Sequence, residues 1–231
     1  MMIVVTGASG ALGGTLCRQL VKAGHEVAAL GSPGPGLLRL GAELGPTCVG
    51  VPMDLRAPAA WADALPQIEA RIGAPDGAVL CAGAWAGGHP LHEAPEGELG
   101  AMLEANLDTA QQALRALLPG MIARGRGSVV VIGSRAVERP WTSTGAAAYA
   151  AAKSGLVALA QAVAAEVLES GVRVNAVLPS TIATAANRAA MPTAEQARWV
   201  TAESLCEVIA FLLSEAARDV SGAAIPVYGR A

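Results

Sequence analysis

Short apolar segments alternate with segments of helical length along this whole sequence. The apolar segments are nearly continuous and mostly rich in Val and Ile, which is typical of strands buried on both faces of a sheet. They are Met2–Val5, Glu26–Leu30, Thr47–Val51, Ala78–Cys81, Ser128–Ile132, Val172–Leu178 and Ala223–Val227. The segments with helical spacing are Leu12–Ala23, Leu37–Leu44, Pro58–Ile72, Glu96–Arg124, Ala146–Ser170 and Ala202–Glu215. This alternation predicts an α/β protein with a doubly wound sheet of about seven mostly parallel strands and helices on both faces.

The sequence contains no internal repeat and no linker, so we expect one domain over residues 1–231. Residues 179–201 depart from the tight alternation, because they are polar or small and follow no clear period. They come after the carboxyl end of the sixth strand, where open α/β sheets bind ligands. We therefore expect a lid over a substrate in this segment, with a plain connector as the alternative.

The first expected strand runs directly into a glycine-rich turn that opens the first helix. Glycines allow a tight turn and a close approach of the backbone to a pyrophosphate, and the helix N-terminus offers N–H groups and a partial positive charge. The pattern alone is weak, but its place at the start of a βαβ unit favours a dinucleotide site over a purely structural turn. The candidate cofactor-binding residues of the turn are Gly7, Ser9, Gly10, Ala11, Leu12 and Gly13.

The end of the second strand bears on cofactor choice. Enzymes selective for NAD usually carry an acidic residue there, which binds the ribose 2′-OH. This sequence has none, and Ser32 and Arg39 are the only local candidates for a 2′-phosphate, so we expect NADP(H) to be favoured over NAD(H). At the end of the third strand, Asp54 and Leu55 are candidates for contact with adenine; a turn or cap role for Asp54 is the alternative.

Tyr149 and Lys153 stand four residues apart in an expected helix, on the same face, in a chain with only two tyrosines and two lysines. A nearby ammonium favours the phenolate, and so lowers the tyrosine pKa toward the range of a general acid or base. The alternative is an exposed contact on a helix surface. Ser134 follows the fifth strand and could hydrogen-bond a substrate carbonyl in the same crevice, although a serine there is more often a turn or cap residue.

These residues and several others resemble the short-chain dehydrogenase/reductase family in order and approximate spacing, over essentially the whole chain. The matching positions are Thr6–Gly13, Cys81-Ala82-Gly83, Asn106, Ser134, Tyr149-x-x-x-Lys153 and Asn175–Pro179. The resemblance implies a Rossmann-like sheet, a nicotinamide cofactor and a tetrad of Asn106, Ser134, Tyr149 and Lys153. In that family the tyrosine moves the proton, the serine orients the carbonyl, the lysine lowers the tyrosine pKa and binds the nicotinamide ribose, and the asparagine holds a water in a proton relay.

The resemblance also implies further cofactor contacts and an assembly. The contacts are Cys81, Ala82, Gly83, Tyr149, Lys153, Pro179, Ile182 and Thr184. Family members commonly form homodimers or homotetramers through two long helices, which correspond here to Glu96–Arg124 and Ala146–Ser170.

Three departures from the family pattern bear on cofactor contacts and leave the tetrad intact. The middle glycine of the turn usually stands one position later, where this chain has Ala11. The Asn-Asn-Ala-Gly after the fourth strand reads Leu80-Cys81-Ala82-Gly83, and the Pro-Gly after the sixth reads Pro179-Ser180.

A narrower resemblance is to dihydropteridine reductase, in residues 81–88 and in residues 187–192 followed by Trp199. That enzyme ordinarily lacks the catalytic serine and carries an acid after the second strand, whereas this chain has Ser134 and no such acid. The likeness therefore supports a similar lid without identifying a pterin substrate.

Large side chains in loops after strand ends are the candidates for substrate contact: Trp85, Trp141, Met191 and Trp199. They predict a flat or apolar substrate, with coverage of the sheet's rim as the alternative. His89 and His92 have no metal-ligand pattern, so we expect no metal. Glu138 and Arg139 either contact a polar substrate or only each other and solvent.

Composition excludes several classes of protein. A formal net charge of -3 gives no basic field for nucleic acid, and no uninterrupted apolar stretch is long enough to predict a membrane span. The four cysteines are widely spaced without a C-x-x-C, which favours reduced thiols, and the first residues lack the basic segment of a signal peptide. We expect a cytoplasmic protein.

The leading hypothesis is an NAD(P)(H)-dependent oxidoreductase that moves a hydride onto or off a small-molecule carbonyl, through Tyr-Lys-Ser acid–base chemistry. The alternatives are a quinonoid dihydropteridine reductase-like enzyme and a non-catalytic, nicotinamide-sensing protein on the same scaffold.

Overall fold

The computed structural model describes residues 1–230 and contains one seven-stranded sheet of order β3-β2-β1-β4-β5-β6-β7. Each of its six strand pairings is parallel. The strands are β1 (Met2–Thr6), β2 (Glu26–Gly31), β3 (Cys48–Pro52), β4 (Gly77–Leu80), β5 (Gly127–Ile132), β6 (Val172–Pro179) and β7 (Ala224–Val227). Every expected strand is present to within about one residue at each end, and the predicted Rossmann-like α/β fold is confirmed.

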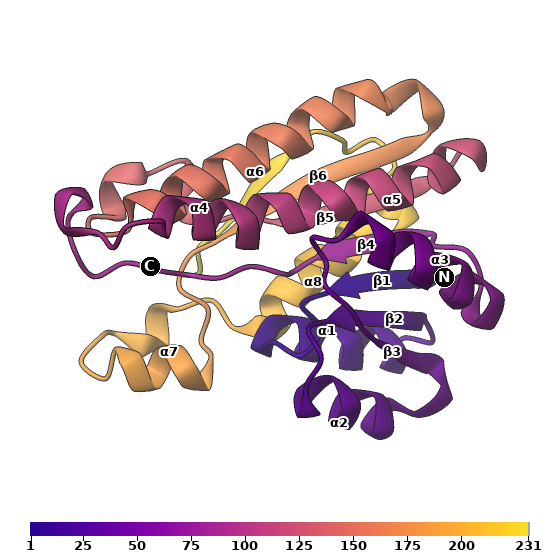
Figure 1. The fold of residues 1–231 in the computed structure, drawn as a ribbon, viewed down its shortest axis with the longest axis horizontal. Coiled ribbons are helices and arrows are strands. Elements are labelled where there is room, and N and C mark those ends of the chain that lie inside the picture. Colours follow the sequence, from indigo (N-terminus) through magenta and orange to yellow (C-terminus); the bar gives the residue numbers. More distant parts are fainter. Residues whose placement is uncertain (231) are drawn as a thin grey trace.

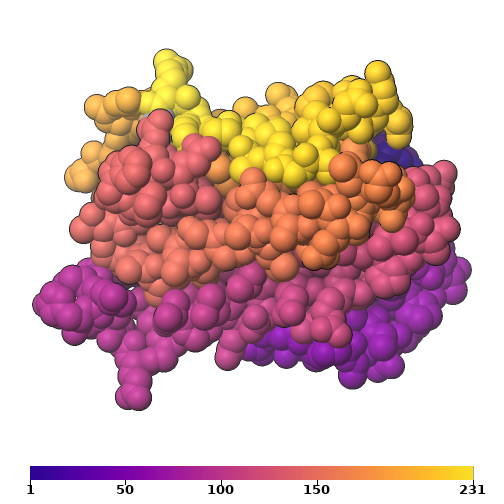
Figure 2. All heavy atoms as spheres, turned by 90° about the horizontal axis from the view of Figure 1, so that it is seen from above, coloured from indigo at the N-terminus to yellow at the C-terminus, as the bar shows by residue number. Residues whose placement is uncertain are grey.

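Helices cover both faces of the sheet (Figure 1). One face packs against α1 (Ala11–Lys22), α2 (Pro35–Leu44) and α8 (Ala202–Leu213). The other packs against α3 (Pro58–Ile72), α5 (Thr109–Ala123) and α6 (Ala147–Glu166). Figure 2 looks onto this second face, where α6, in orange, crosses between the pink α5 and the yellow C-terminal residues.

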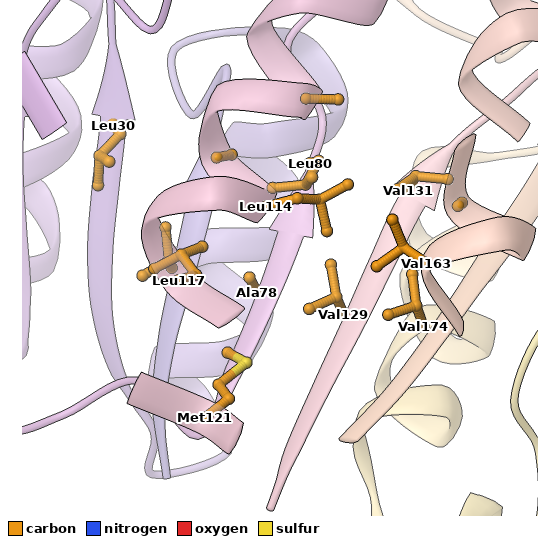
Figure 3. Packing of buried hydrophobic residues seen from close by; sticks show 14 of the residues in the cluster. Leu30, Ala78, Leu80, Leu114, Leu117, Met121, Val129, Val131, Val163 and Val174 are labelled. Atoms are coloured by element: carbon orange, nitrogen blue, oxygen red, sulfur yellow. The ribbon is translucent and has the colours of Figure 1, made fainter. Parts of the chain in front are cut away.

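The two cores follow from the two-residue period of a strand. In β1, Met2 and Val4 enter the core under α3, α5 and α6, whereas Ile3 and Val5 enter the opposite core. Figure 3 shows the first core, in which Leu114 and Leu117 of α5 lie beside Leu80 and Ala78 of β4. The residues that α5 and α6 bury are mainly Ala, Leu and Val, and these small side chains let both helices pack closely on the sheet.

The expected helical segment Glu96–Arg124 is helical from Glu98 to Ala123, with one departure that the sequence did not predict. It forms α4 (Glu98–Leu103), a π-helical turn (Glu104–Asp108) and then α5. Asn106 lies in this turn, and its Nδ2 donates to the Met102 carbonyl oxygen at 2.9 Å. That carbonyl is the acceptor that an α-helix would assign to the Asn106 backbone N–H, so the side chain competes with the regular ladder and favours the wider turn.

The segment 179–201 has more structure than its sequence predicts. It contains a short helix, α7 (Ala185–Ala190), whose first turn is capped by Thr184, since Oγ1 accepts from the Asn187 N–H at 3.1 Å. A parallel bridge between Ile182 and Val200 closes its base. In Figure 1, α7 projects from the end of the molecule where the strands terminate.

Helix α6 has the length and apolar composition of a membrane-spanning helix, and among residues 1–230 it is the one helix that does. Half of that window is buried inside the protein. Its exposed positions include Ala151, Ala158, Ala162 and Ala165, which leaves a face of small side chains.

Candidate active site

The glycine-rich turn lies at the switch point of the sheet, where β1 pairs with β2 on one side and β4 on the other. Gly7 has φ +63°, and a Cβ there would lie 2.8 Å from the Ala82 backbone nitrogen, so only glycine fits. A Cβ on Gly13 would overlap the Gly7 carbonyl oxygen. Gly10 begins α1 with no side-chain cap, which leaves the first N–H groups of the helix free for a phosphate.

A pocket of about 880 Å³ opens from this turn along the carboxyl ends of β2, β3 and β4 to the π-helical turn. The predicted cofactor residues that line it are Gly7, Ser9, Gly10, Ser32, Asp54, Leu55, Cys81, Ala82 and Gly83. Of the other residues predicted in the turn, Leu12 and Gly13 are buried beneath it, and Ala11 is exposed as the first residue of α1.

Arg56 and Glu104 also line this pocket, and the sequence analysis missed both. Arg56 forms ion pairs with Asp54 at 3.0 Å and with Glu104 at 3.1 Å. The hydrogen bonds from Arg56 hold the pKa of Asp54 below its usual range. Asp54 is thus already engaged where an adenine contact was expected. The sequence could have indicated Arg56, because this basic residue stands two positions after Asp54. Glu104 could not be found in this way, because only the tertiary fold brings it to the pocket.

Ser134 and Tyr149 meet at the carboxyl end of β5. Ser134 begins a 3₁₀ turn, and its Oγ accepts from the Ala136 N–H at 3.2 Å. Burial raises the pKa of Tyr149, and the nearby Ser134 hydroxyl works in the opposite direction. The net shift is upward, so the expected lowering by a neighbouring ammonium does not dominate here.

Lys153 lies one helical turn from Tyr149, with Nζ 5.9 Å from the centre of the Tyr149 ring. It is buried, and Nζ donates to the Ile132 carbonyl oxygen at 2.8 Å. Burial lowers the pKa of Lys153 to about 8, against a smaller opposing effect from Cys81. Burial thus moves the two pKa values in opposite directions, since it disfavours the ammonium of Lys153 and the phenolate of Tyr149 alike.

Asn106 completes the group. Its Nδ2 donates to the Ala84 carbonyl oxygen at 3.0 Å, and its Oδ1 accepts from the Ala84 N–H at 3.3 Å. Gly83 lies between Asn106 and Lys153, because a Cβ there would be 2.5 Å from Asn106 Oδ1 and 3.3 Å from Lys153 Nζ. The four residues of the predicted tetrad therefore come together from β5, α6 and the π-helical turn.

The remaining predicted residues lie after β6 and in loops. Pro179 ends β6, Ile182 bridges to Val200 and Thr184 caps α7. Of the large side chains expected at the substrate, Trp85 and Trp141 are 65% and 73% exposed, Met191 is 38% exposed and Trp199 is partly buried. They do not form a closed pocket in this state.

Within residues 1–230, no group of three His, Cys, Asp or Glu side chains is placed to hold a metal ion. All four cysteines are free thiols. His89 Nε2 lies 2.8 Å from Glu98 Oε2, which ties the loop after β4 to α4.

The chain's residues fit a nicotinamide dinucleotide. The turn has no room for a Cβ at Gly7 and presents uncapped helix N–H groups at Gly10, which suits a pyrophosphate. The pocket continues from there past Gly83, which is flanked by the buried Lys153.

Comparisons with known proteins agree with this geometry. A family model described as short chain dehydrogenase matches residues 1–195. The chain belongs to the short-chain dehydrogenase family, and it is an NAD(P)-dependent oxidoreductase by that membership.

Three relatives illustrate the similarity. The chain is 34% identical over 228 residues to an inactive 2-(S)-hydroxypropyl-CoM dehydrogenase of Xanthobacter autotrophicus, covering 93% of this chain and 98% of the relative. It is 29% identical over 234 residues to the 3-oxoacyl-[acyl-carrier-protein] reductase of Salmonella typhimurium, covering 98% and 95%. A crystal structure of a 3-oxoacyl-[acyl-carrier protein] reductase with bound NAD from Brucella melitensis superposes with a TM-score of 0.88 at 25% identity, covering 99% and 90%.

Proposed function

We propose that this protein transfers a hydride between NADP(H) and a carbonyl or alcohol substrate, with Tyr149 as the general acid or base. The observation that supports the proposal is the convergence of Ser134, Tyr149 and Lys153 at the carboxyl ends of the strands, next to a pocket that suits a dinucleotide. Convergence of a titratable pair and a hydroxyl in a crevice at a switch point is the arrangement such chemistry requires.

Each residue has a defined role in this reaction. The bound nicotinamide supplies or accepts the hydride. In reduction, the Tyr149 hydroxyl donates its proton to the carbonyl oxygen as negative charge develops there, and in oxidation the phenolate accepts the alcohol proton. The Ser134 hydroxyl donates a hydrogen bond to the same oxygen and orients it. Positive charge on Lys153 favours the phenolate of Tyr149.

Asn106 and the turn at Gly7–Gly13 hold the cofactor side of the site. Asn106 fixes the backbone of Ala84, and hence Gly83, against Lys153. In this proposal it also positions a water that returns a proton to Lys153. The pyrophosphate is bound by the N–H groups at the start of α1.

The preference for NADP(H) rests on the end of β2. Ser32 is exposed at the pocket edge and no carboxylate neighbours it in sequence, so a 2′-phosphate meets no repulsion there. Arg56 is the cation that lines the same pocket, and its exposed ion pairs are weak enough to exchange for a phosphate.

We also propose a role for residues 179–201, a cellular location and an assembly. Residues 179–201 act as the substrate lid of a single domain, and the protein works in the cytoplasm, where its free thiols stay reduced. It assembles as a homodimer or homotetramer through α5 and the small-residue face of α6.

A second candidate function is a non-catalytic nicotinamide sensor, which one observation favours: the relative at 34% identity is named as inactive. A dihydropteridine reductase-like activity is disfavoured by Ser134, which lies where that enzyme ordinarily has no serine.

A substrate panel tests the proposal. Purified protein is incubated at pH 7 with NADPH or NADH and 3-oxoacyl thioesters, 3-oxo acids, cyclic and aromatic ketones and a quinonoid dihydropterin. We expect NADPH oxidation with at least one carbonyl class. Nucleotide binding with no turnover of any of them contradicts the proposal in favour of a sensor, and turnover of the quinonoid compound alone favours a pterin reductase.

A further inference from the structure

The residues that follow β7 contact two segments around the proposed substrate site, one of them at both of its ends. We call Tyr228, Gly229 and Arg230 the β7 clasp. The Tyr228 hydroxyl donates to Glu138 Oε2 at 2.6 Å, and the Arg139 guanidinium lies 5.3 Å from the centre of the Tyr228 ring. Both partners belong to the loop that begins at Ser134, so the clasp holds that loop from outside.

The second contact is with Arg198, the last residue of a 3₁₀ turn (Gln196–Arg198) in the segment 179–201. The Arg230 N–H donates to the Arg198 carbonyl oxygen at 2.9 Å, and Arg198 Nε donates to the Arg230 carbonyl oxygen at 2.7 Å. Gly229 has φ +64°, and a Cβ there would lie 2.8 Å from the Arg198 carbonyl oxygen. The backbone of the clasp therefore packs directly on the base of the proposed lid.

The third contact is with Ser180, the residue after β6, at the start of the same segment. Ser180, which is buried, donates from Oγ to the Tyr228 carbonyl oxygen at 2.7 Å, and its N–H donates to the Val227 carbonyl oxygen at 3.3 Å. Ser180 stands where the short-chain dehydrogenase pattern usually has glycine. Its hydroxyl thus gives this chain a bond to the clasp that a glycine could not make.

The Tyr228–Glu138 bond is suited to a lasting contact. A neutral hydroxyl that donates to a carboxylate forms a short, charge-assisted hydrogen bond. Burial, together with Glu138, raises the pKa of Tyr228 to about 12, so the hydroxyl keeps its proton at the pH values where the enzyme is assayed. Stacking of the Arg139 guanidinium on the same ring adds a second attraction.

We propose that Tyr228 is a positioning residue that couples the lid at 179–201 to the loop carrying Ser134, so that both sides of the substrate site close as one unit. This inference rests on the proposed function, in which Ser134 and the lid face the substrate. The pocket at the glycine-rich turn, which includes Gly7, Ser32 and Asp54, does not include the clasp. Loosening the clasp therefore weakens substrate binding and leaves binding of the adenosine side of the nucleotide, in this pocket, unchanged.

Four variants test the coupling. Tyr228→Phe keeps the ring beneath Arg139 and removes the hydroxyl, Glu138→Ala removes the acceptor, Glu138→Gln keeps an acceptor oxygen, and the fourth combines Tyr228→Phe with Glu138→Ala. Arg218→Ala is the control, because it breaks an exposed ion pair with Asp219 that lies before β7, at the opposite ends of the strands.

We expect Tyr228→Phe and Glu138→Ala each to raise the substrate KM about 3- to 10-fold, the range for one hydrogen bond to a partly exposed charged group. The Kd for 2′,5′-ADP, which occupies only the adenosine side of the site, should stay within about twofold of the wild type because the pocket at the glycine-rich turn is untouched, and kcat should fall by less than KM rises. The double variant should match the single variants and Glu138→Gln should restore KM, because the two side chains act through one bond. An unchanged KM, additive effects, a fall in kcat larger than the rise in KM, or weaker binding of 2′,5′-ADP overturns the proposal.

Hydrogen exchange gives a readout that needs no turnover. With NADPH bound, Tyr228→Phe and Glu138→Ala should speed exchange in peptides spanning 181–200 and 134–139, while β1 and β4 peptides and the Arg218→Ala protein exchange as the wild type does. Faster exchange in a protein that turns over no carbonyl would retain the coupling and reject the proposed function. Unchanged exchange in both segments rejects the coupling itself.

Discussion

The Lys153 ammonium donates its hydrogen bond to the carbonyl oxygen of Ile132, two residues before Ser134, at 2.8 Å. The bond fixes the face of α6 that carries Tyr149 against the end of β5 that carries Ser134. Gly133 makes this approach possible, since a Cβ there would lie 2.5 Å from a Leu178 methyl and 2.9 Å from a Val157 methyl. The relative placement of the proposed catalytic groups therefore depends on one buried, charged bond.

Burial of Lys153 predicts a specific dependence of stability on pH. Its pKa is about 8 in the folded protein and near 10.5 when exposed, so between these values the unfolded chain binds a proton that the folded protein does not. The free energy of unfolding therefore rises with pH through this window, by about 3 kcal/mol at about 1.4 kcal/mol for each tenfold change in proton affinity. Below pH 8 both states are protonated, and the full cost of the buried charge is present.

Lys153→Met should lack this rise. The measurement is urea unfolding of both proteins at intervals from pH 7 to 10.5, taken as a difference so that other titrating groups cancel. The stability of the wild type relative to the variant should increase across the window. A constant difference would mean that Lys153 titrates normally in the folded protein.

The turn at the start of α1 offers a matched pair of glycines. A Cβ on Gly13 overlaps the Gly7 carbonyl oxygen, whereas one on Gly14 meets the flexible Arg18 guanidinium at 3.3 Å and the Ala8 carbonyl oxygen at an ordinary contact distance of 3.5 Å. Gly13→Ala should lose several kcal/mol of stability or fail to bind nucleotide, as expected for a backbone clash at a buried position. Gly14→Ala should be neutral or stabilising by up to about 1 kcal/mol, from helix propensity. Thermal unfolding with and without NADPH checks both, and equal behaviour of the two variants would contradict the geometry.

Ser32 tests the choice of cofactor. A carboxylate at this position would accept from the ribose 2′-OH of NADH and repel the 2′-phosphate of NADPH. Ser32→Asp should therefore lower the ratio of NADPH to NADH affinity at least about tenfold, equivalent to 1.4 kcal/mol. Asparagine has nearly the size of aspartate without its charge, so Ser32→Asn should leave the ratio of NADPH to NADH affinity nearly unchanged. Fluorescence titration of both nucleotides measures this affinity ratio. Equal ratios in Ser32→Asp and Ser32→Asn would show that the ribose does not bind beside Ser32.

The sequence predicted the sheet well because its signal is local. Strands such as Val172–Pro179 are continuous apolar runs, and their bounds follow from composition and the flanking turns. The π-helical turn was not predictable in this way, since residues 96–124 keep an apolar face throughout. The turn depends on where the Asn106 amide finds its acceptors, Met102 and Ala84, and the second of these comes from a different loop.

The residues of the site differ in the same way: some have a local signal in the sequence and others do not. Gly7, Tyr149 and Lys153 carry spacing signals that are visible in one sequence. Contacts between remote segments carry none: Arg56 with Glu104, and Tyr228 with Glu138, are 48 and 90 residues apart. The direction of the Tyr149 pKa was also missed, because the spacing of Tyr149 and Lys153 gives no information on how deeply both are buried.

The most direct test of the central claim compares Tyr149→Phe with the wild type on the best carbonyl of the panel. Phenylalanine keeps the ring and removes the proton that the reaction needs. We expect kcat to fall by roughly 10²- to 10⁴-fold, the usual contribution of a general acid or base, while the Kd for NADPH stays within about twofold. Full activity in Tyr149→Phe would contradict a role for Tyr149 as the general acid or base.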